Sequence, residues 1–236
     1  MQSNGLLNAI FAFIRMSTTQ KRLLLLTLSL VLFVVAFKPV RRAYSHTFGQ
    51  AATDRKLLHN GDLIFHTSKS QQSRAIQLAT RSPYSHCGMV CQQNGEWMVL
   101  EAVQPVKFTT LRKWIIRGEG DHYVVKRLRD ADKALTPQVW QRMMAAGKSM
   151  LGRDYDLTFG WSDDRIYCSE LIWKVYEQGL GRKVGQLQQL RDFDLSNPAV
   201  KAKLTERYGN DLPLDETVIS PVSIFNSPEL VTVLSR

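Results

Sequence analysis

The segment RIYCSELIWKV, residues 165–175, decides how the rest of the chain is organised. Its apolar residues Leu171, Ile172 and Val175 recur at the spacing of one helix face, which predicts an amphipathic helix packed on a core. Cys168 falls in the first turn of that helix, where unpaired backbone N–H groups and the helix dipole lower the pKa of a thiol. The segment therefore supplies a candidate nucleophile, and a buried structural cysteine is the alternative until partners are found.

A β-hairpin is predicted upstream of this helix. Asn94-Gly95 separates two largely apolar segments, residues 84–92 and 96–104. This dipeptide is a strong signal for a two-residue hairpin turn, because both of its positions require a positive φ. The two segments are therefore expected to pair as antiparallel strands.

The register of this hairpin brings two polar side chains together. A two-residue turn makes His86 and Glu101 diagonal neighbours on one face, with backbones about 7–8 Å apart and side chains within reach of each other. The same alternation places Cys87 and Cys91 on the opposite face, roughly 13 Å apart along the strand. That separation argues against a disulfide between them and against a metal site that they would share with His86.

Cys168, His86 and Glu101 have the residue types of a nucleophilic triad. The imidazole would take the thiol proton, the carboxylate would orient the imidazole, and the thiolate would attack a carbonyl carbon. Each residue also has a non-catalytic explanation, as a packed cysteine, a core histidine and a surface carboxylate. Four other histidines are rival bases, but none lies on a strand whose hairpin partner offers a carboxylate on the same face: His46, His59, His66 and His122.

The remaining pattern predicts one α+β domain, an antiparallel sheet packed against helices, within residues 43–236. Thr136 followed by Pro137 is a specific helix start, and Asn197-Pro198 is expected to begin another helix. No internal repeat, glycine-rich phosphate loop or nucleophile-elbow pattern is present in the sequence. The other expected elements are strands at 62–66 and 121–128, helices at 70–80 and 136–151, a strand running into a helix over 107–117, and apolar segments within 220–233 that cover the core.

Residues 1–42 are expected to form a membrane anchor. Residues 23–37 carry no charge, although this run is shorter than the roughly 20 residues that span a bilayer core. The basic residues Lys38, Arg41 and Arg42 follow it directly, where a cleavable export signal would have small residues. A retained single-pass transmembrane helix that contacts membrane lipid is therefore favoured over a cleaved signal, and the balanced basic flanks leave its orientation open.

The charge and cysteine content exclude several functional classes. The net charge is +10, but six of the basic residues lie in the acid-free residues 1–42. The main domain has no recognised nucleic-acid motif or basic run, so a nucleic-acid partner is not expected. Three sparse cysteines indicate no disulfide framework, and no metal or cofactor is expected.

Seven segments together resemble a known family. They cover nearly all of residues 57–236, and they resemble the YiiX and YaeF group of circularly permuted papain-like amidases, relatives of the NlpC hydrolases. The segments are GDLIF at 61–65, AIQLAT at 75–80, YSHCGMV at 84–90, LEAVQPVKFTTL at 100–111, YVVKR at 123–127, YCSELIWKVY at 167–176 and FDLSNP at 193–198.

The resemblance implies a circularly permuted papain-like fold, in which a strand histidine precedes a helix cysteine. It implies a triad of Cys168, His86 and Glu101 and an amidase or peptidase activity, which would proceed through a thioester acyl-enzyme. Members of this family usually begin with a cleavable export signal, so residues 1–42 depart from the pattern, and the resemblance places the catalytic domain in the periplasm. Two other functions stay open: a lipid acyltransferase or thioesterase like the lecithin retinol acyltransferases, and an inactive membrane-tethered binding module.

Three further residues are candidate contacts for a peptide-like or acylated substrate. Tyr167 adjoins the candidate nucleophile and could help to form an oxyanion hole, although a tyrosine before a helix also packs in many proteins. Tyr155 and Asp156 could contact substrate, with Asp156 receiving an ammonium group. A structural cap is the alternative role for Asp156.

Overall fold

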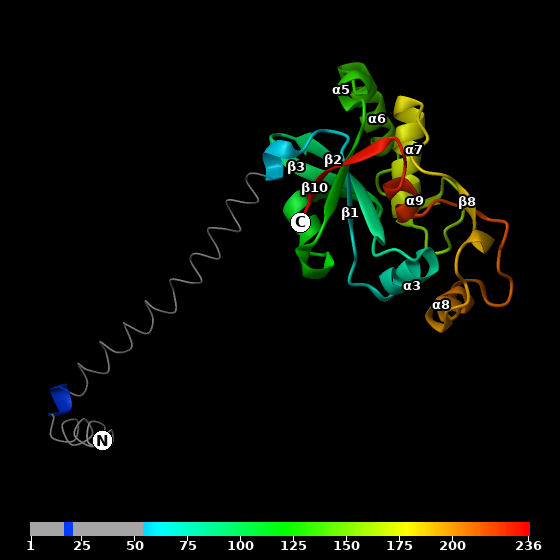
Figure 1. The fold of residues 1–236 in the computed structure, drawn as a ribbon, viewed down its shortest axis with the longest axis horizontal. Coiled ribbons are helices and arrows are strands. Elements are labelled where there is room, and N and C mark those ends of the chain that lie inside the picture. The colour runs from blue at the N-terminus through cyan, green and yellow to red at the C-terminus, as the bar shows by residue number, and fades with distance from the viewer. Residues whose placement is uncertain (1–16, 21–53) are drawn as a thin grey trace. The chain divides into compact units, whose positions relative to one another are not determined.

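The computed structural model describes residues 17–20 and 54–236. The chain divides into two compact units, Met1–Lys56 and Leu57–Arg236, and the second contains the sheet (Figure 1). Cys168, His86 and Glu101 also belong to the second unit. The predicted apolar span at residues 23–37 lies outside the described residues. Among the described residues, no helix is long and apolar enough to cross a membrane.

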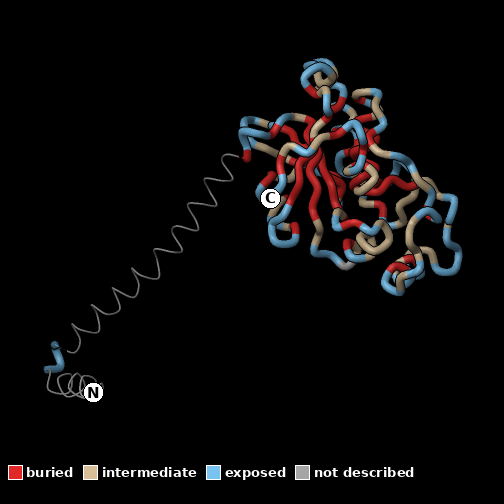
Figure 2. The backbone as a smooth tube through the Cα atoms, viewed as in Figure 1, coloured by how far each residue is buried: buried red, intermediate tan, exposed pale blue. Residues whose placement is uncertain are grey.

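An antiparallel sheet forms the centre of the second unit. Its strand order among the described residues is β10-β5-β1-β2-β3-β4 (Figure 1). The interiors of its central strands are buried (Figure 2), as expected for a sheet covered on both faces. The strands are β1 Leu63–His66, β2 His86–Gln93, β3 Glu96–Glu101, β4 Lys107–Thr110, β5 Val124–Leu128 and β10 Leu230–Ser235.

Strands β2 and β3 form the predicted hairpin. Met89 pairs with Leu100, and Gln93 pairs with Glu96 next to the turn, so the predicted register is confirmed. Gly95 has φ 80° and the preceding asparagine has φ 49°, the left-handed values that a tight hairpin turn requires. Turn chemistry therefore fixes which residues of the two strands share a face.

The helices begin at the capping signals in the sequence. Thr136 accepts a hydrogen bond from the N–H of Val139, and Asn197 accepts one from Ala199, so each cap satisfies an N–H that the helix leaves unpaired. The helices are α3 Gln71–Thr80, α4 Leu111–Ile115, α5 Ala131–Ala134, α6 Pro137–Ser149, α7 Cys168–Leu180, α8 Pro198–Tyr208 and α9 Pro221–Phe225. Short 3₁₀ turns are η1 Glu119–Asp121 and η2 Leu190–Asp192.

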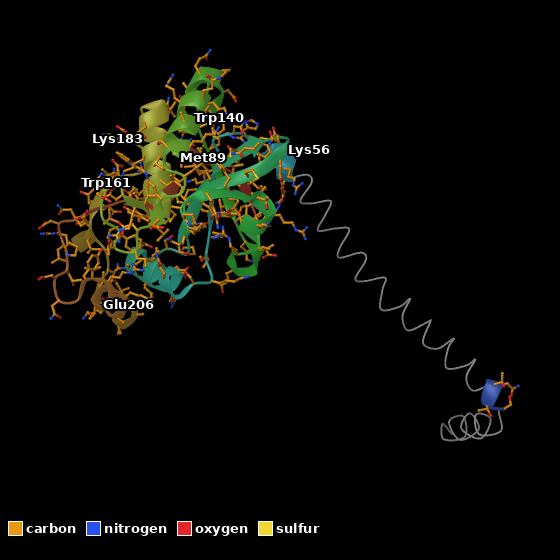
Figure 3. The ribbon with its side chains drawn as sticks, turned by 180° about the vertical axis from the view of Figure 1, so that it is seen from behind. Lys56, Met89, Trp140, Trp161, Lys183 and Glu206 are labelled. Atoms are coloured by element: carbon orange, nitrogen blue, oxygen red, sulfur yellow. The ribbon has the colours of Figure 1, made fainter. Side chains whose placement is uncertain are left out.

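Alternate strand residues pack against different helices. On one face, Phe65 of β1 and Met89 of β2 (labelled in Figure 3) share a buried cluster with Leu171 of α7. On the other face, Ile64 of β1 lies in a second cluster with Trp114 of α4. The predicted antiparallel sheet packed against helices is therefore confirmed, and α7 carries Cys168 to the first of these faces.

The segments after β5 include structure that the sequence did not predict. The segment at 220–233 supplies α9 and β10, and β10 pairs with β5 as an edge strand. The loop at 153–165 includes β6 Asp154–Tyr155, which pairs in parallel with β7 Arg165–Ile166. Strands β8 Gln188–Gln189 and β9 Thr217–Val218 also pair. Two-residue strands are too short for an apolar alternation, so no sequence pattern reveals them.

Candidate active site

Cys168 is the first residue of α7, in the position that the sequence predicts. The preceding residue, Tyr167, is the N-cap, and its N–H donates to Oε2 of Glu170 at 3.3 Å. This contact fixes the first helical turn around the thiol. Cys168 is buried and is one of the residues that line a cavity.

His86 and Glu101 are joined as the hairpin register predicts. His86 is the first residue of β2, and its Nε2 lies 2.8 Å from Oε2 of Glu101. Glu101 is fully buried and His86 is buried, so water screens this contact little. The carboxylate is therefore placed to fix the orientation of the imidazole.

Glu101 has two more partners that the sequence analysis did not identify. Thr109 Oγ1 donates to Oε1 of Glu101 at 2.5 Å, and Nη2 of Arg117 contacts both carboxylate oxygens at 2.5 and 2.6 Å. Burial raises the pKa of Glu101, but contacts with His86 and Arg117 outweigh it and lower this pKa to about 2. The carboxylate is consequently ionised across the neutral range.

Cys168 and His86 shift each other's pKa. Hydrogen bonding with Cys87 lowers the pKa of Cys168 most, burial opposes this, and His86 lowers it further, so the pKa lies well below its usual value. For His86, burial disfavours the proton, but hydrogen bonding with Cys168 and Glu101 raises the pKa to about 9. At neutral pH these directions favour a thiolate beside an imidazolium.

Cys87 is the closest of the other cysteines to the reaction centre. The predicted strand alternation is confirmed, because Cys87 belongs to the buried cluster on the α7 face of the sheet. Helix α7 packs on this face and brings Cys168 against Cys87, a tertiary contact that strand alternation does not predict. Cys91 lies farther along β2, and burial raises its pKa to about 11. All three cysteines are free.

An aromatic stack flanks the imidazole of His86. The ring of His66 stacks on Trp114 with centroids 3.9 Å apart, and the His86 ring lies 5.3 Å from His66. Burial, followed by the positive charge of His86, lowers the pKa of His66 to about 3. His66 is therefore a neutral ring at neutral pH, and it adds no charge next to the imidazolium.

Of the two tyrosines, Tyr155 lies closer to the reaction centre. Its hydroxyl accepts a hydrogen bond from Gln72 Nε2 at 3.2 Å. Burial, followed by the charge of Cys168, raises the pKa of Tyr155 well above its usual value, so the phenol keeps its proton. The hydroxyl of Tyr167 instead accepts the N–H of Ile219 at 3.0 Å inside the core, which favours the packing role for Tyr167.

Asp156 shapes the loop before α7. Its Oδ1 accepts hydrogen bonds from the N–H and the hydroxyl of Thr158, and Oδ2 accepts the N–H of Gly160 at 2.7 Å. The residue is buried. These contacts correspond to the structural cap that the sequence left as the alternative, and they leave little capacity for a substrate ammonium group.

The contact between Thr109 and Glu101 follows a pattern that can be read from the sequence. β4 pairs with β3, so that Lys107 lies opposite Glu101 and Thr109 lies opposite Val99. The alternation that joins His86 to Glu101 would therefore also have placed Thr109 on the face of Glu101. Arg117 follows α4 without a local pattern, and only the tertiary fold brings it to the carboxylate.

Two cavities reach these residues. The first is narrow, about 80 Å³, is lined by Cys168 and is almost wholly apolar, with walls that include Ala75, Ile76, Phe193, Leu195, Val200 and Leu204. The second is wider, about 440 Å³, and is lined by His86; apolar surface predominates in it, but its lining also includes the polar residues Ser68, Ser70, Ser73, Ser85, Gln104 and Arg117. Gln72 and Ile76 of α3 line both cavities.

No metal site is evident in the part of the chain that the structure describes. Among residues 17–20 and 54–236, no three His, Cys, Asp or Glu side chains are grouped as a metal site requires.

Known proteins resemble this chain over about three quarters of its length. A protein from Escherichia coli K12, described as uncharacterized protein YiiX, is 51% identical over 173 residues, which are 73% of this chain and 84% of that protein. A crystal structure described as the metalloprotein YiiX from Escherichia coli O157:H7 superposes with a TM-score of 0.72 at 51% identity, over 75% of this chain and 97% of that one. The family model described as permuted papain-like amidase enzyme, YaeF/YiiX, C92 family, matches residues 57–234. The chain therefore belongs to this family of permuted papain-like amidases.

Proposed function

We propose that the protein is a cysteine hydrolase that cleaves an amide bond through a thioester acyl-enzyme on Cys168. The observation that carries this proposal is the connected set of Cys168, His86 and Glu101, in which the hydrogen bond between the last two measures 2.8 Å. The depressed pKa of Cys168 supports it, because the thiolate is the nucleophilic form. A cysteine that only packs in a core has its pKa raised by burial instead.

The reaction follows from the charges in the site. The Cys168 thiolate attacks the carbonyl carbon, and the His86 imidazolium then protonates the leaving nitrogen as the tetrahedral intermediate collapses to the thioester. Neutral His86 next takes a proton from water, which hydrolyses the thioester and frees the acid. Tyr155 contacts Cys168 and stays protonated, so we assign its hydroxyl, in place of that of Tyr167, as a donor to the oxyanion.

An active-site titration tests the nucleophile. A p-nitrophenyl ester should release close to one equivalent of nitrophenol per chain in a rapid burst, because acylation precedes slower hydrolysis. Cys168→Ala should abolish the burst, and Cys91→Ala, which removes another buried thiol of the same fold, should retain it. A burst that survives in Cys168→Ala would exclude Cys168, and an unreactive wild-type Cys168 would favour the binding-module alternative.

The apolar cavity favours a second candidate, lipid acyl transfer or thioester hydrolysis. This cavity reaches Cys168, and Lys203 and Arg207 of α8 add positive charge to its lining. A narrow apolar space fits an aliphatic chain, and nearby cations suit an anionic lipid head group. Turnover of a matched octanoyl amide and octanoyl thioester separates the candidates. An amidase cleaves both, whereas an enzyme confined to acyl transfer or thioester hydrolysis leaves the amide intact.

A further inference from the structure

Two free thiols, those of Cys87 and Cys168, lie in contact. Cys87 is the second residue of β2 and Cys168 is the first residue of α7, and both belong to the buried cluster between these elements. The thiol and the backbone N–H of Cys87 both donate hydrogen bonds to the sulfur of Cys168. His86, which precedes Cys87 on the strand, hydrogen-bonds to the same sulfur. Two neighbouring residues therefore hold the Cys168 sulfur at the start of β2, directly against the second thiol.

The proposed hydrolysis consumes only one of these two thiols. Burial, followed by the hydrogen bond and the charge of Cys168, raises the pKa of Cys87 well above its usual value, so Cys87 keeps its proton beside the thiolate. It stabilises that thiolate, but its sulfur forms no bond to substrate in the reaction. A thiol beside a thiolate also permits a chemistry that hydrolysis does not use, the formation of a disulfide.

Cys91 is the natural comparison for this pair. It is free and buried, as Cys87 is, and it lies on the same strand, roughly 13 Å farther along. That separation is too long for a disulfide between Cys87 and Cys91. Burial raises the pKa of Cys91 to about 11, so this thiol is also unreactive at neutral pH. Substitution of Cys91 therefore removes a buried thiol without removing the pair.

We propose, resting on the function above for its effect on activity, that Cys168 and Cys87 are a reversible redox pair, in which a small hydroperoxide oxidises Cys168 and Cys87 then closes a disulfide with it. The disulfide occupies the nucleophile, so it switches hydrolysis off. Reduction by a dithiol returns both thiols by exchange and switches hydrolysis on again. Cys87 thus protects the nucleophile from irreversible oxidation.

The oxidation takes two balanced steps. The Cys168 thiolate attacks one peroxide oxygen, the O–O bond breaks, and the leaving oxygen takes a proton from the His86 imidazolium. Sulfur is thereby oxidised to a sulfenic acid, and the peroxide is reduced to water or an alcohol. The Cys87 sulfur then attacks the sulfenic sulfur, the S–O bond breaks, and the departing hydroxide takes the thiol proton as water.

The site favours both steps. The pKa of Cys168 lies well below its usual value, and the thiolate is the form that peroxides oxidise. Conversion of Cys168 to a neutral sulfenic acid removes the charge that raises the pKa of Cys87, so Cys87 loses its proton more readily once the first step is complete. The cavity that Cys168 lines measures about 80 Å³, whereas one water needs roughly 10–15 Å³ of such space, so a molecule as small as hydrogen peroxide fits in it.

Peptide mapping of the full chain after treatment with hydrogen peroxide tests the pair. Digested without reduction, the wild type should yield one species in which the peptides of Cys87 and Cys168 are joined, and Cys91→Ala should yield the same species. The p-nitrophenyl ester burst should fall in proportion to this disulfide and return with dithiothreitol. Cys168 recovered as a sulfinic acid with Cys87 still a free thiol, or a disulfide that includes Cys91, would overturn the proposal.

Cys87→Ala supplies the matched variant without the second thiol. Its sulfenic acid should react with further peroxide to the sulfinic acid, which thiol reductants do not reverse, so the burst should stay lost after dithiothreitol. Products are compared at completion, because this substitution also raises the pKa of the nucleophile and slows the first step. A burst that returns as fully as in the wild type would contradict the protective role of Cys87. If Cys87→Ala does not fold, the wild-type peptide map still decides the proposal.

Failure of the hydrolase function gives a different result from failure of the redox pair. The disulfide is detected by mass and needs no substrate. If the reduced protein gives no ester burst but the disulfide forms, the redox pair stands and its effect on hydrolysis falls with the proposed function. If the burst is present and peroxide yields no disulfide between Cys87 and Cys168, the hydrolase stands and the redox pair is wrong.

Discussion

At the scale of single residues, charges alternate in sign through the centre of the site. Arg117 contacts Glu101, Glu101 contacts His86, and His86 interacts with Cys168. Each buried charge therefore has a partner of opposite sign, which offsets the cost of removing it from water. The same arrangement sets the protonation states that the proposed reaction needs.

The first prediction concerns the alkaline limit of acylation. His86 has a pKa of about 9, so acylation should decline above that pH as the imidazolium is lost. Glu101→Gln removes an anion that raises this pKa and should move the decline to lower pH. It should also reduce the acylation rate by several orders of magnitude, as loss of the orienting carboxylate does in a serine triad.

Arg117→Met is the matched variant, for which the expected shift of the His86 pKa has the opposite sign. It removes a cation near the imidazolium, so the alkaline decline should move to higher pH. The pH dependence of the ester burst measures both shifts. Shifts in the same direction, or no shift in either variant, would contradict the proposed charge arrangement.

The second prediction concerns Cys87. Strand alternation alone predicts that Cys87→Ala keeps activity, because Cys87 points away from His86. Its hydrogen bonding with Cys168 is, however, the largest influence that lowers the pKa of the nucleophile. Cys87→Ala should therefore raise that pKa and move the acid limit of alkylation by iodoacetamide to higher pH, while Cys91→Ala should leave it in place. An unchanged profile in Cys87→Ala would show that the contact with Cys87 does not stabilise the thiolate.

At the scale of secondary structure, α7, which begins at Cys168, packs closely against α6 near its C-terminal end. Gly179 of α7 lies so close to α6 that a Cβ at this position would meet the Cα of Met143 at 2.5 Å. A backbone atom cannot move aside as the end of a flexible side chain can. A side chain at this position would therefore force the two helices apart.

The third prediction follows from this close approach. Gly179→Ala should destabilise the fold by about 1–3 kcal/mol, the usual cost of overpacking, with a clear fall in the midpoint of thermal unfolding. Gln178→Ala, at the exposed neighbouring position, is the control and should change stability by a few tenths of a kcal/mol at most. Equal midpoints for the two variants would show that the helices adjust without strain.

Sequence reasoning succeeded where a local rule was sufficient. Asn94-Gly95 determined the hairpin register, and the register determined the contact between His86 and Glu101. The reasoning failed where the deciding contact was tertiary. Arg117 reaches Glu101 from a segment with no pattern of its own, and Tyr167 packs against the backbone of Ile219, which no property of the sequence near Tyr167 indicates.

At the scale of the whole molecule, the second unit accounts for the family match. The compact unit Leu57–Arg236 and the family match over residues 57–234 agree closely. The sheet, both cavities and the candidate residues Cys168, His86 and Glu101 all lie within it. The proposed chemistry therefore depends on this unit, and residues 1–42 are expected to decide only where the protein is located.

The fourth prediction concerns that location. The uncharged run at residues 23–37, with basic residues on both sides, should keep the protein in the membrane pellet after high-salt and carbonate washing, because screening of charge does not release a hydrophobic span. Fractionation followed by N-terminal sequencing is the measurement. A mature protein that begins near His46 would show that the segment is a cleaved signal.

The central claim is that Cys168 carries the acyl group of an amide substrate during turnover. The most direct measurement is rapid acid quenching of the reaction with the octanoyl amide, followed by mass spectrometry of the digested protein. An octanoyl group on the peptide that contains Cys168, present during turnover and removed by hydroxylamine as a thioester is, is the result that we expect. Turnover of the amide with no acyl group on that peptide, or with the group on another residue, would contradict the account.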